Sequence, residues 1–416
     1  MRRYDLDWLR IAAFGLLIGY HVGMLYVPWT FHVKSEYRGG PELAALMLAS
    51  NPWRLSLLFV VSGAATAFMA QGLGRGALAW QRVKRLLIPL VFGMAVVVVP
   101  QVYFEVTQAG RYSGGFMAFW GRYLHGDQSL GTPIPTWNHL WFVAYLLVYT
   151  LIVVALAPKP RLAEAAPAQP PRAAVVALLL GPWFVLWVLR MTLFPLFGSN
   201  HAMLRDWYEH TLYFGMFLFG FTLVRQPALW LAIDRLRWSA LALAVLGALV
   251  FIGLSLGWGD AFAPGEWQRP VGRAGREAQA WGAVLAALGF GQRHLNHDHR
   301  WRAYLVDVIF AYYIVHQTAL IALAVWLKPL QLGGALEAAL VIGGTAVACV
   351  VMAEVARRSA WLRPLFGFRP APSESGPPSP IERRRIPSDR AKQCCLRNSG
   401  LQRIDDLIQL DTSLCL

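Results

Sequence analysis

The sequence predicts an all-α fold: a polytopic membrane bundle of about ten transmembrane helices, with both termini in the cytoplasm. Three observations support this fold class. Of the 416 residues, 56% are apolar and only 15% are charged, and the mean hydropathy of +0.43 is far from that of soluble domains. Apolar segments of about 20 residues, long enough to cross about 30 Å of hydrocarbon, recur along the chain. Lys and Arg gather mainly in alternate linkers between them.

Ten segments have the length and apolarity of a membrane span, the eighth least clearly. They cover residues 8–27, 54–71, 86–104, 139–157, 173–192, 209–225, 238–258, 277–292, 303–327 and 334–356. The first follows a positive start, MRR, as a signal peptide would. Asp5 and Asp7 interrupt that region, however, and no small-residue cleavage site follows closely. We therefore interpret the first segment as a retained anchor.

The positive charges indicate the orientation of the bundle. A cytoplasmic N-terminus puts the linkers RGALAWQRVKR, PKPRLAEAAPAQPPR, RQPALWLAIDRLR and RHLNHDHRWR inside. Of the 38 Lys and Arg residues, 19 then lie inside, 11 outside and 8 beyond residue 368. This bias favours both termini inside, although Arg269, Arg273 and Arg276 fall in an outer loop. Topology and contact with anionic lipids account for the net charge of +15 better than a nucleic-acid partner does.

The composition changes near residue 369, where Pro, Ser and charged residues replace the apolar periodicity. We expect residues 1–368 to form one transmembrane domain and residues 369–416 to form a disordered, basic cytoplasmic tail. Of the four cysteines, Cys349 lies in the last span and the others lie in the tail. Their spacing predicts neither a metal site nor a disulfide framework.

The first span carries two polar side chains, Arg10 and His21. Eleven helical steps turn the chain through about three full turns, so both residues lie on one face, some 16 Å apart along the axis. Arg10 is close enough to the inner boundary to snorkel to phosphate headgroups, and a lone intramembrane histidine often serves helix packing. Ionisable residues inside a bilayer are nevertheless expensive and mark functional sites.

Other spans add polar residues. His316 lies in AYYIVHQTALIA, deep in the ninth span, and His139 lies in the Trp-rich start of the fourth, where an aromatic belt is the simpler explanation. Arg82 and Arg85 stand one helical turn apart, with Lys84 beside them. Two guanidiniums at this spacing are compatible with the positive charge that ordinarily flanks a span on the cytoplasmic side, and equally with a phosphate-binding site.

Small residues in the second span have two interpretations. Ser62 and Gly63, in LFVVSGAATAF, favour close helix packing. A nucleophilic role for Ser62 is less favoured, because no G-x-S-x-G sequence surrounds it.

These motifs, taken in order, resemble the membrane-bound acyltransferase-3 family. The likeness covers most of residues 5–368 and rests on an arginine, ten residues and a histidine in the first span, then FVVSG, RVKRLLIP and YYIVHQ. Within the family it is nearest to the glucan biosynthesis protein C branch. That narrower match rests on HVGMLYVPWTFHVKS, SLLFVVSG, VVPQV and HLWFVAYLLVY. Many family members have a glutamate shortly after the tryptophan of the fourth span, whereas Trp141 is followed by FVAY.

The resemblance implies an O-acyltransferase of the bacterial inner membrane. Such an enzyme would take an acyl group from cytoplasmic acyl-CoA, with no tightly bound cofactor, and deliver it to a hydroxyl of an extracytoplasmic glycan. The branch implies a succinyl group, with acetyl next, and a periplasmic glucan as acceptor. The same residues fit a transporter or flippase for a glycan, or a structural subunit, but no internal repeat or pair of broken half-helices supports transport.

The family pattern and the predicted topology together assign roles to single residues. His21 becomes the general base, and Arg10 orients the donor or balances charge along one path through the bundle. His316 is a second polar group that holds the acyl carbonyl or the acceptor. The remaining candidates bind substrates: Arg82, Lys84 and Arg85 contact the phosphates of CoA, and His32, Trp137 and His139 lie near the outer face, where the acceptor arrives.

Overall fold

The computed structural model describes residues 3–157, 169–257 and 267–369, which form helices and connecting loops without a β-strand. The α-helices are α1 (Tyr4–Gly23), α2 (Pro41–Ser50), α3 (Arg54–Gly72), α4 (Arg75–Phe92), α5 (Val99–Gln108), α6 (Phe116–Leu124), α7 (Trp141–Leu156), α8 (Arg172–Thr192), α9 (Phe194–Phe197), α10 (Trp207–Leu223), α11 (Pro227–Gly257), α12 (Gln268–His294), α13 (Arg300–Leu327), α14 (Gly334–Arg358) and α15 (Leu362–Leu365). A π-helical turn at Gly93–Val97 joins α4 to α5, and a 3-10 turn at Asn138–Leu140 precedes α7.

The predicted fold class is confirmed: the chain is an all-α, multi-pass membrane protein. A helix lies at each of the ten predicted positions within the described ranges, and seven helical stretches there are long and apolar enough to cross a membrane. Three helices at predicted positions, α1, α10 and α12, do not belong to these seven stretches. The α10 helix is short, with 17 residues, and α1 and α12 contain buried charged side chains such as Asp5 and Glu277, which lower their hydropathy. All three contribute residues to the lining of the cavity described below.

Several helix boundaries differ from the predicted spans. The α4 helix begins at Arg75 instead of 86, and α11 begins at Pro227 instead of 238. Hydropathy identifies only the part of a helix that lies in the hydrocarbon core. The backbone hydrogen bonds of the helix continue through the membrane–water interface until the sequence ends the helix. The linkers therefore include helical turns. The predicted tail lies outside the described residues, except for Arg369.

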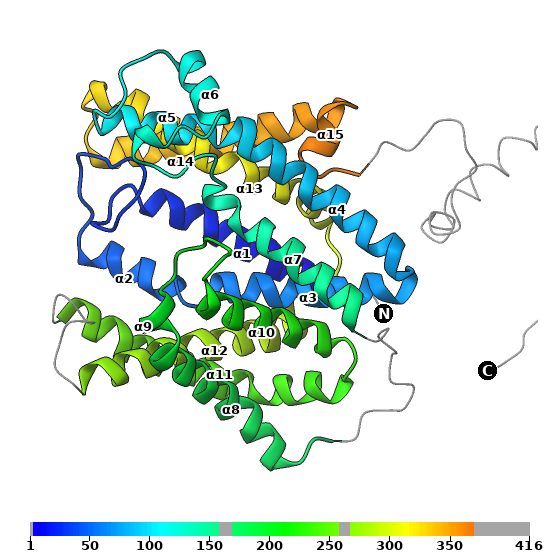
Figure 1. Cartoon of the computed structure of the whole chain (residues 1–416). Coiled ribbons are helices and arrows are strands. Elements are labelled where there is room, and N and C mark those ends of the chain that lie inside the picture. Colours follow the sequence, from blue (N-terminus) through cyan, green and yellow to red (C-terminus); the bar gives the residue numbers. More distant parts are fainter. Residues whose placement is uncertain (1–2, 158–168, 258–266, 370–416) are drawn as a thin grey trace, which may run out of the picture. The chain divides into compact units, whose positions relative to one another are not determined.

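The α1 helix occupies the centre of the bundle and contacts α3, α12 and α13. Figure 1 shows α4, α5, α13 and α14 on one side of α1 and α8, α10, α11 and α12 on the other. Between the two groups lies a core of aromatic rings. The ring of Phe59 lies 4.7 Å from that of Phe142 and 4.8 Å from that of Tyr213, and the ring of Phe14 lies 5.2 Å from that of Tyr313. Three members of this core, Phe142, Tyr213 and Tyr313, also line the cavity described below.

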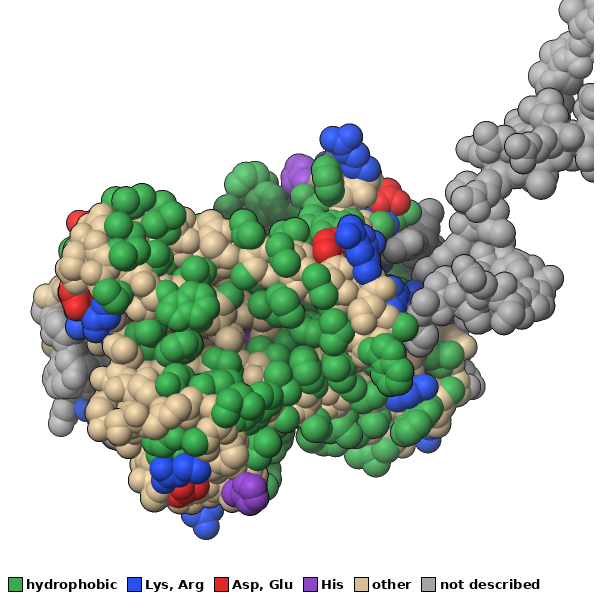
Figure 2. Space-filling model, turned by 90° about the horizontal axis from the view of Figure 1, so that it is seen from above, with side chains coloured by type: hydrophobic (Ala, Val, Ile, Leu, Met, Phe, Trp, Pro, Cys, Tyr) green, Lys and Arg blue, Asp and Glu red, His purple; other side chains and the backbone are tan. Residues whose placement is uncertain are grey.

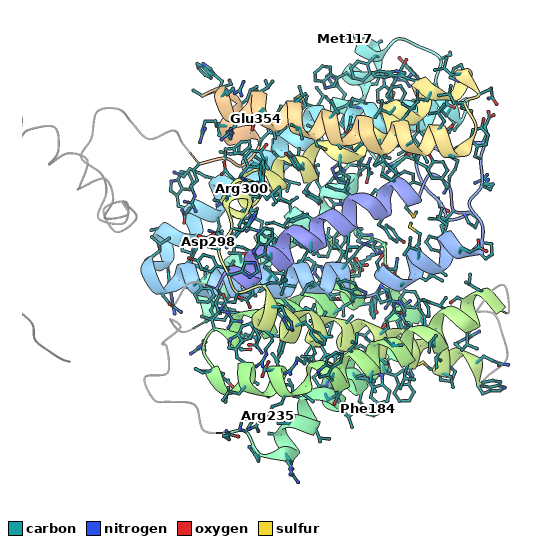
Figure 3. The ribbon with its side chains drawn as sticks, turned by 180° about the vertical axis from the view of Figure 1, so that it is seen from behind. Met117, Phe184, Arg235, Asp298, Arg300 and Glu354 are labelled. Carbon is teal, nitrogen blue, oxygen red and sulfur yellow. The ribbon has the colours of Figure 1, made fainter. Side chains whose placement is uncertain are left out.

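The exterior is apolar, as lipid contact requires. Figure 2 shows hydrophobic side chains across the middle of one face and charged side chains toward its edges. In Figure 3, Phe184 points away from α8, where 54% of its surface is exposed, whereas Asp298 and Arg300 lie toward the end of the bundle at which α1 begins. Large apolar side chains are exposed on α8, α11 and α14. Their exposure to water would be unfavourable, so we expect them to contact the hydrocarbon chains of membrane lipids.

The α3 and α10 helices cross at two glycines. A Cβ atom on Gly63 would lie 1.9 Å from the carbonyl oxygen of Phe217, and one on Gly220 would lie 1.8 Å from that of Val60. No side chain fits there, because backbone atoms cannot move aside without separating the helices. The predicted role of small residues in the second span is thus confirmed at Gly63.

We expect Gly63→Ala to destabilise the protein by about 1–3 kcal/mol, because the added methyl group forces α3 and α10 apart. Gly215→Ala on α10 is the matched control. Its Cβ meets nothing within 4 Å, and alanine favours a helix over glycine. Thermal unfolding of both variants in detergent measures the difference, and equal melting temperatures would contradict the tight crossing.

Candidate active site

A cavity of about 260 Å³ lies between α1, α3, α7, α10 and α12, at the end of the bundle where α1 ends. Ligand pockets commonly measure about 300–1,000 Å³, so this one has room for a short acyl chain or part of a sugar, but not for a nucleotide. Polar and charged residues from distant parts of the chain meet in its lining, notably His21, Arg54, His139, His201, Glu209 and Arg276.

Two histidines form a hydrogen-bonded pair beside the cavity. Nδ1 of His21 lies 2.8 Å from Nε2 of His316, and the rings are stacked with their centres 5.0 Å apart. Nδ1 of His316 lies 2.6 Å from the carbonyl oxygen of Tyr313, which accepts only. In the neutral pair, His316 therefore carries its proton on Nδ1 and accepts at Nε2, and His21 donates from Nδ1.

This arrangement leaves one nitrogen of His21 without a proton. Nε2 of a neutral imidazole that donates from Nδ1 is a lone-pair acceptor. His21 lines the cavity and keeps part of its surface accessible, whereas His316 is fully buried behind it. The pair thus has the geometry of a base held by an orienting acceptor, the arrangement on which nucleophile activation depends.

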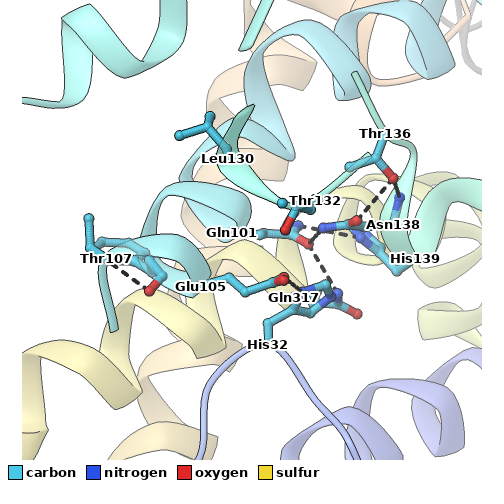
Figure 4. A network of polar contacts seen from close by, with 12 residues as sticks. His32, Gln101, Glu105, Thr107, Leu130, Thr132, Thr136, Asn138, His139 and Gln317 are labelled. Carbon is cyan, nitrogen blue, oxygen red and sulfur yellow. Dashed lines mark hydrogen bonds and ion pairs between the residues drawn. The ribbon is translucent and has the colours of Figure 1, made fainter. Parts of the chain in front are cut away.

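His139 completes a cluster of three imidazoles. It lies in the 3-10 turn before α7, with its ring perpendicular to that of His316 and 5.1 Å from it. Its Nε2 donates to the carbonyl oxygen of Ile314 at 3.1 Å, so Nδ1 accepts from the Gln101 amide at 3.4 Å. Figure 4 shows that Gln101 also binds Asn138 and Gln317. This network fixes the His139 ring from two sides.

A carboxyl group enters the cavity from the first turn of α10. Glu209 accepts a hydrogen bond from the hydroxyl of Ser199 and lies 3.2 Å from Nε2 of His201. Burial lowers the pKa of His201 to about 4, so its ring is neutral at physiological pH. The ring of Trp141 packs against His201, 4.0 Å between centres, and forms part of an aromatic wall.

Three guanidiniums cluster at the opposite end of the bundle. Arg10 donates to the carbonyl oxygen of Val306 at 3.4 Å, and Arg82 donates to the hydroxyl of Thr66 at 3.1 Å. Arg85 lies close enough to Arg10 and Arg82 for mutual repulsion. None of the three forms an ion pair with a described acidic side chain, so an anion would relieve their repulsion.

Several predicted residues lie outside these clusters. Lys84 is exposed and sits over the ring of Trp80, 5.3 Å from its centre. His32 is paired with Glu105 at 2.5 Å and does not line the cavity. The indole of Trp137 donates to the carbonyl oxygen of His201 at 2.9 Å, so Trp137 holds the His201 loop instead of facing the cavity.

The expected open path from Arg10 to His21 is interrupted. Phe14 lies between them on the same face of α1 and is buried. Its ring contacts those of Phe142 and Tyr313, 6.2 Å and 5.2 Å between centres. The helical periodicity places Arg10 and His21 on one face, as predicted, but aromatic rings from α7 and α13 fill the space along it. Donor access requires these rings to move.

Sequence reasoning missed four polar residues of the cavity: Arg54, His201, Glu209 and Arg276. Arg54 and Glu209 stand in the first turn of a helix, where a charge in the sequence is easily taken for an interfacial flank, and His201 lies in the loop before α10. Of these residues, only Arg276 could have been suspected from the sequence, because it lies in an outer loop of the predicted topology, where positive charges are less common. Its guanidinium is paired with Glu277 at 2.6 Å and faces the cavity.

Comparison with known proteins agrees with this geometry. A family profile described as an acyltransferase domain, Acyl_transf_3, matches residues 3–354. The chain belongs to the acyltransferase-3 family. This acyltransferase is similar to the glucans biosynthesis protein C of Escherichia coli O6:K15:H31 strain 536, with 25% identity over 345 residues that cover 79% of the chain and 84% of the relative. The corresponding protein of E. coli SMS-3-5 is 25% identical over 346 residues, with the same coverage. No solved structure matches.

Proposed function

We propose that this acyltransferase moves an acyl group, succinyl in preference to acetyl, from cytoplasmic acyl-CoA to a hydroxyl of a periplasmic glucan, and that it does so in the bacterial inner membrane. The observation that carries the proposal is the hydrogen-bonded His21–His316 pair at the cavity, because its contacts leave Nε2 of His21 free to accept a proton. The name of the E. coli relatives supports glucan as the acceptor. With the N-terminus inside, as the charge distribution favours, the cavity lies toward the periplasm and the arginine cluster lies toward the cytoplasm.

The transfer step follows from the histidine pair. Nε2 of His21 removes the proton of the acceptor hydroxyl as its oxygen attacks the thioester carbonyl. The C–O bond forms, the C–S bond of the tetrahedral intermediate breaks, and the departing thiolate of CoA takes the proton back from His21. Nε2 of His316 accepts from Nδ1 of His21 throughout and stabilises the imidazolium. The products are the glycan ester and free CoA.

The acceptor and the donor approach from opposite ends. The rings of Trp141 and Tyr213, 5.5 Å apart, offer aromatic faces to a sugar in the cavity. The cavity is too small for the nucleotide of CoA, so we assign its phosphates to Arg82 and Arg85, with Arg10 nearest the thioester arm. The arm must displace Phe14 to reach His21, and this couples donor binding to movement of the aromatic core.

Mass spectrometry of periplasmic glucans tests the function. Cells with the intact gene should produce glucans carrying a succinyl mass that a deletion strain lacks and that re-expression restores. A transporter would change the location of the glucan and not its mass. Unmodified glucans in the complemented strain would reject the proposal.

Neutralising the arginine cluster should weaken donor binding. We expect Arg82→Met and Arg85→Met each to raise the KM for acyl-CoA by about 10- to 100-fold, because each removes a charge-assisted hydrogen bond to phosphate. Lys84→Met is the matched control, since Lys84 is exposed and directed to Trp80. Initial rates in inside-out vesicles measure the effect. A similar KM in all three variants would remove the phosphate site.

A further inference from the structure

Arg54 is a buried cation that the transfer step does not use. It is the first residue of α3, its surface is 5% exposed, and it lines the same cavity as His21. Its Nε and Nη1 atoms have no hydrogen-bond partner, and its guanidinium carbon lies 3.4 Å from the ring centre of Tyr20. No described acidic side chain forms an ion pair with it. The cavity therefore contains a buried guanidinium without an ion-pair partner among the described residues.

The carboxylates near Arg54 are engaged elsewhere. Glu209 is held by Ser199 and His201, and Glu277 binds Arg276 at 2.6 Å. A buried guanidinium without an anion is strongly unfavourable, and its position at a helix N-terminus adds repulsion from the helix dipole. An anion in the cavity would remove both penalties, because the guanidinium and the free N–H groups of the first turn of α3 would attract it together.

The geometry points to the free carboxylate of a dicarboxylic acyl group as that anion, an inference that rests on the proposed function. The Tyr20 ring lies beside both side chains, 3.4 Å from the guanidinium carbon of Arg54 and 6.3 Å from the ring centre of His21. The carbonyl carbon and the far carboxylate oxygens of a succinyl group are about 5 Å apart at ordinary bond lengths. Both side chains line the same cavity, so a succinyl group there can direct its carboxylate to Arg54 and its thioester carbon to His21.

The consequence is a specificity role for Arg54. The planar fork of the guanidinium suits a carboxylate, and a neutral acyl chain of the same length leaves the charge unpaired. Arg54 thus selects a succinyl group over a butyryl group, which has a methyl group where succinyl has the carboxylate.

Competing donors test this role. With glucan as acceptor, the wild-type protein should prefer succinyl-CoA over butyryl-CoA by about 100-fold in kcat/KM. Arg54→Met should reduce this ratio toward one, and Arg54→Lys should give an intermediate ratio. Arg273→Met is the matched control, because Arg273 is also buried in the bundle but does not line the cavity. Size exclusion and melting temperature identify variants that fold.

The remaining outcomes also decide the proposal. A folded Arg54→Met protein with the wild-type donor ratio overturns it. So does a preference for anionic over neutral glucan that Arg54→Met abolishes, because Arg54 would then bind the acceptor. If the wild-type protein transfers neither donor, the proposed function fails. The anion site is then tested separately, by measuring how added ligands change the melting temperature of the protein. Stabilisation by monomethyl succinate, which keeps one free carboxylate, but not by the neutral methyl butyrate, lost in Arg54→Met, supports the anion site, and its absence in the wild-type protein refutes it.

Discussion

Replacing His21 with alanine is expected to reduce kcat for acyl transfer by about 100- to 10,000-fold, the usual contribution of a positioned general base. The side chain supplies the only imidazole nitrogen of the His21–His316 pair that faces the cavity without a proton. Its removal leaves the acceptor hydroxyl protonated during attack on the thioester. Succinyl content of periplasmic glucans gives the effect in cells, and the rate of CoA release gives it with purified protein.

The control for this variant is His297→Ala. His297 is exposed at the opposite end of the bundle, and its backbone carbonyl, not its ring, accepts from the indole of Trp8 at 3.3 Å. This variant should retain the wild-type rate. A folded His21→Ala protein that also retains the wild-type rate would show that His21 is not the general base, and the proposed mechanism would then be wrong.

The fold was largely predictable because bilayer thickness sets the length of each span. Apolar runs of about 20 residues leave little choice but helices, and a helix lies at each predicted position in the described parts of the chain. The helix ends were less predictable. The α4 and α11 helices extend well beyond their apolar runs, because water and headgroups impose no requirement that a helix stop at the edge of the hydrocarbon.

The candidate site was partly predictable. His21, His139 and His316 stood out because imidazoles are costly in apolar spans, and the structure brings these three rings together. Arg54 and Glu209 did not stand out, because residues at helix ends have the same sequence appearance whether they face water, lipid or a cavity. Phe14 presented the opposite difficulty, since an apolar residue in an apolar span gives no sign that it blocks a path.

His316 should prove as important as His21 although it does not reach the cavity. We expect His316→Leu to lower kcat by about 100-fold or more, while the KM for acyl-CoA changes little. Leucine removes the acceptor for Nδ1–H of His21, so the His21 ring loses its fixed orientation and can move its proton to Nε2, where it blocks base action. A buried N–H without a partner adds to the cost.

A glutamine at position 316 separates this positioning role from packing. Its amide oxygen can occupy roughly the place of the ring Nε2 and accept from His21, so His316→Gln should recover much of the rate that His316→Leu loses. Neither variant keeps the contact to the carbonyl oxygen of Tyr313 unchanged, so a purely structural role predicts similar losses in both. The ratio of kcat between the two variants, at matched melting temperatures, is therefore the informative quantity. Equal kcat values would mean that His316 supports the bundle and does not orient the base.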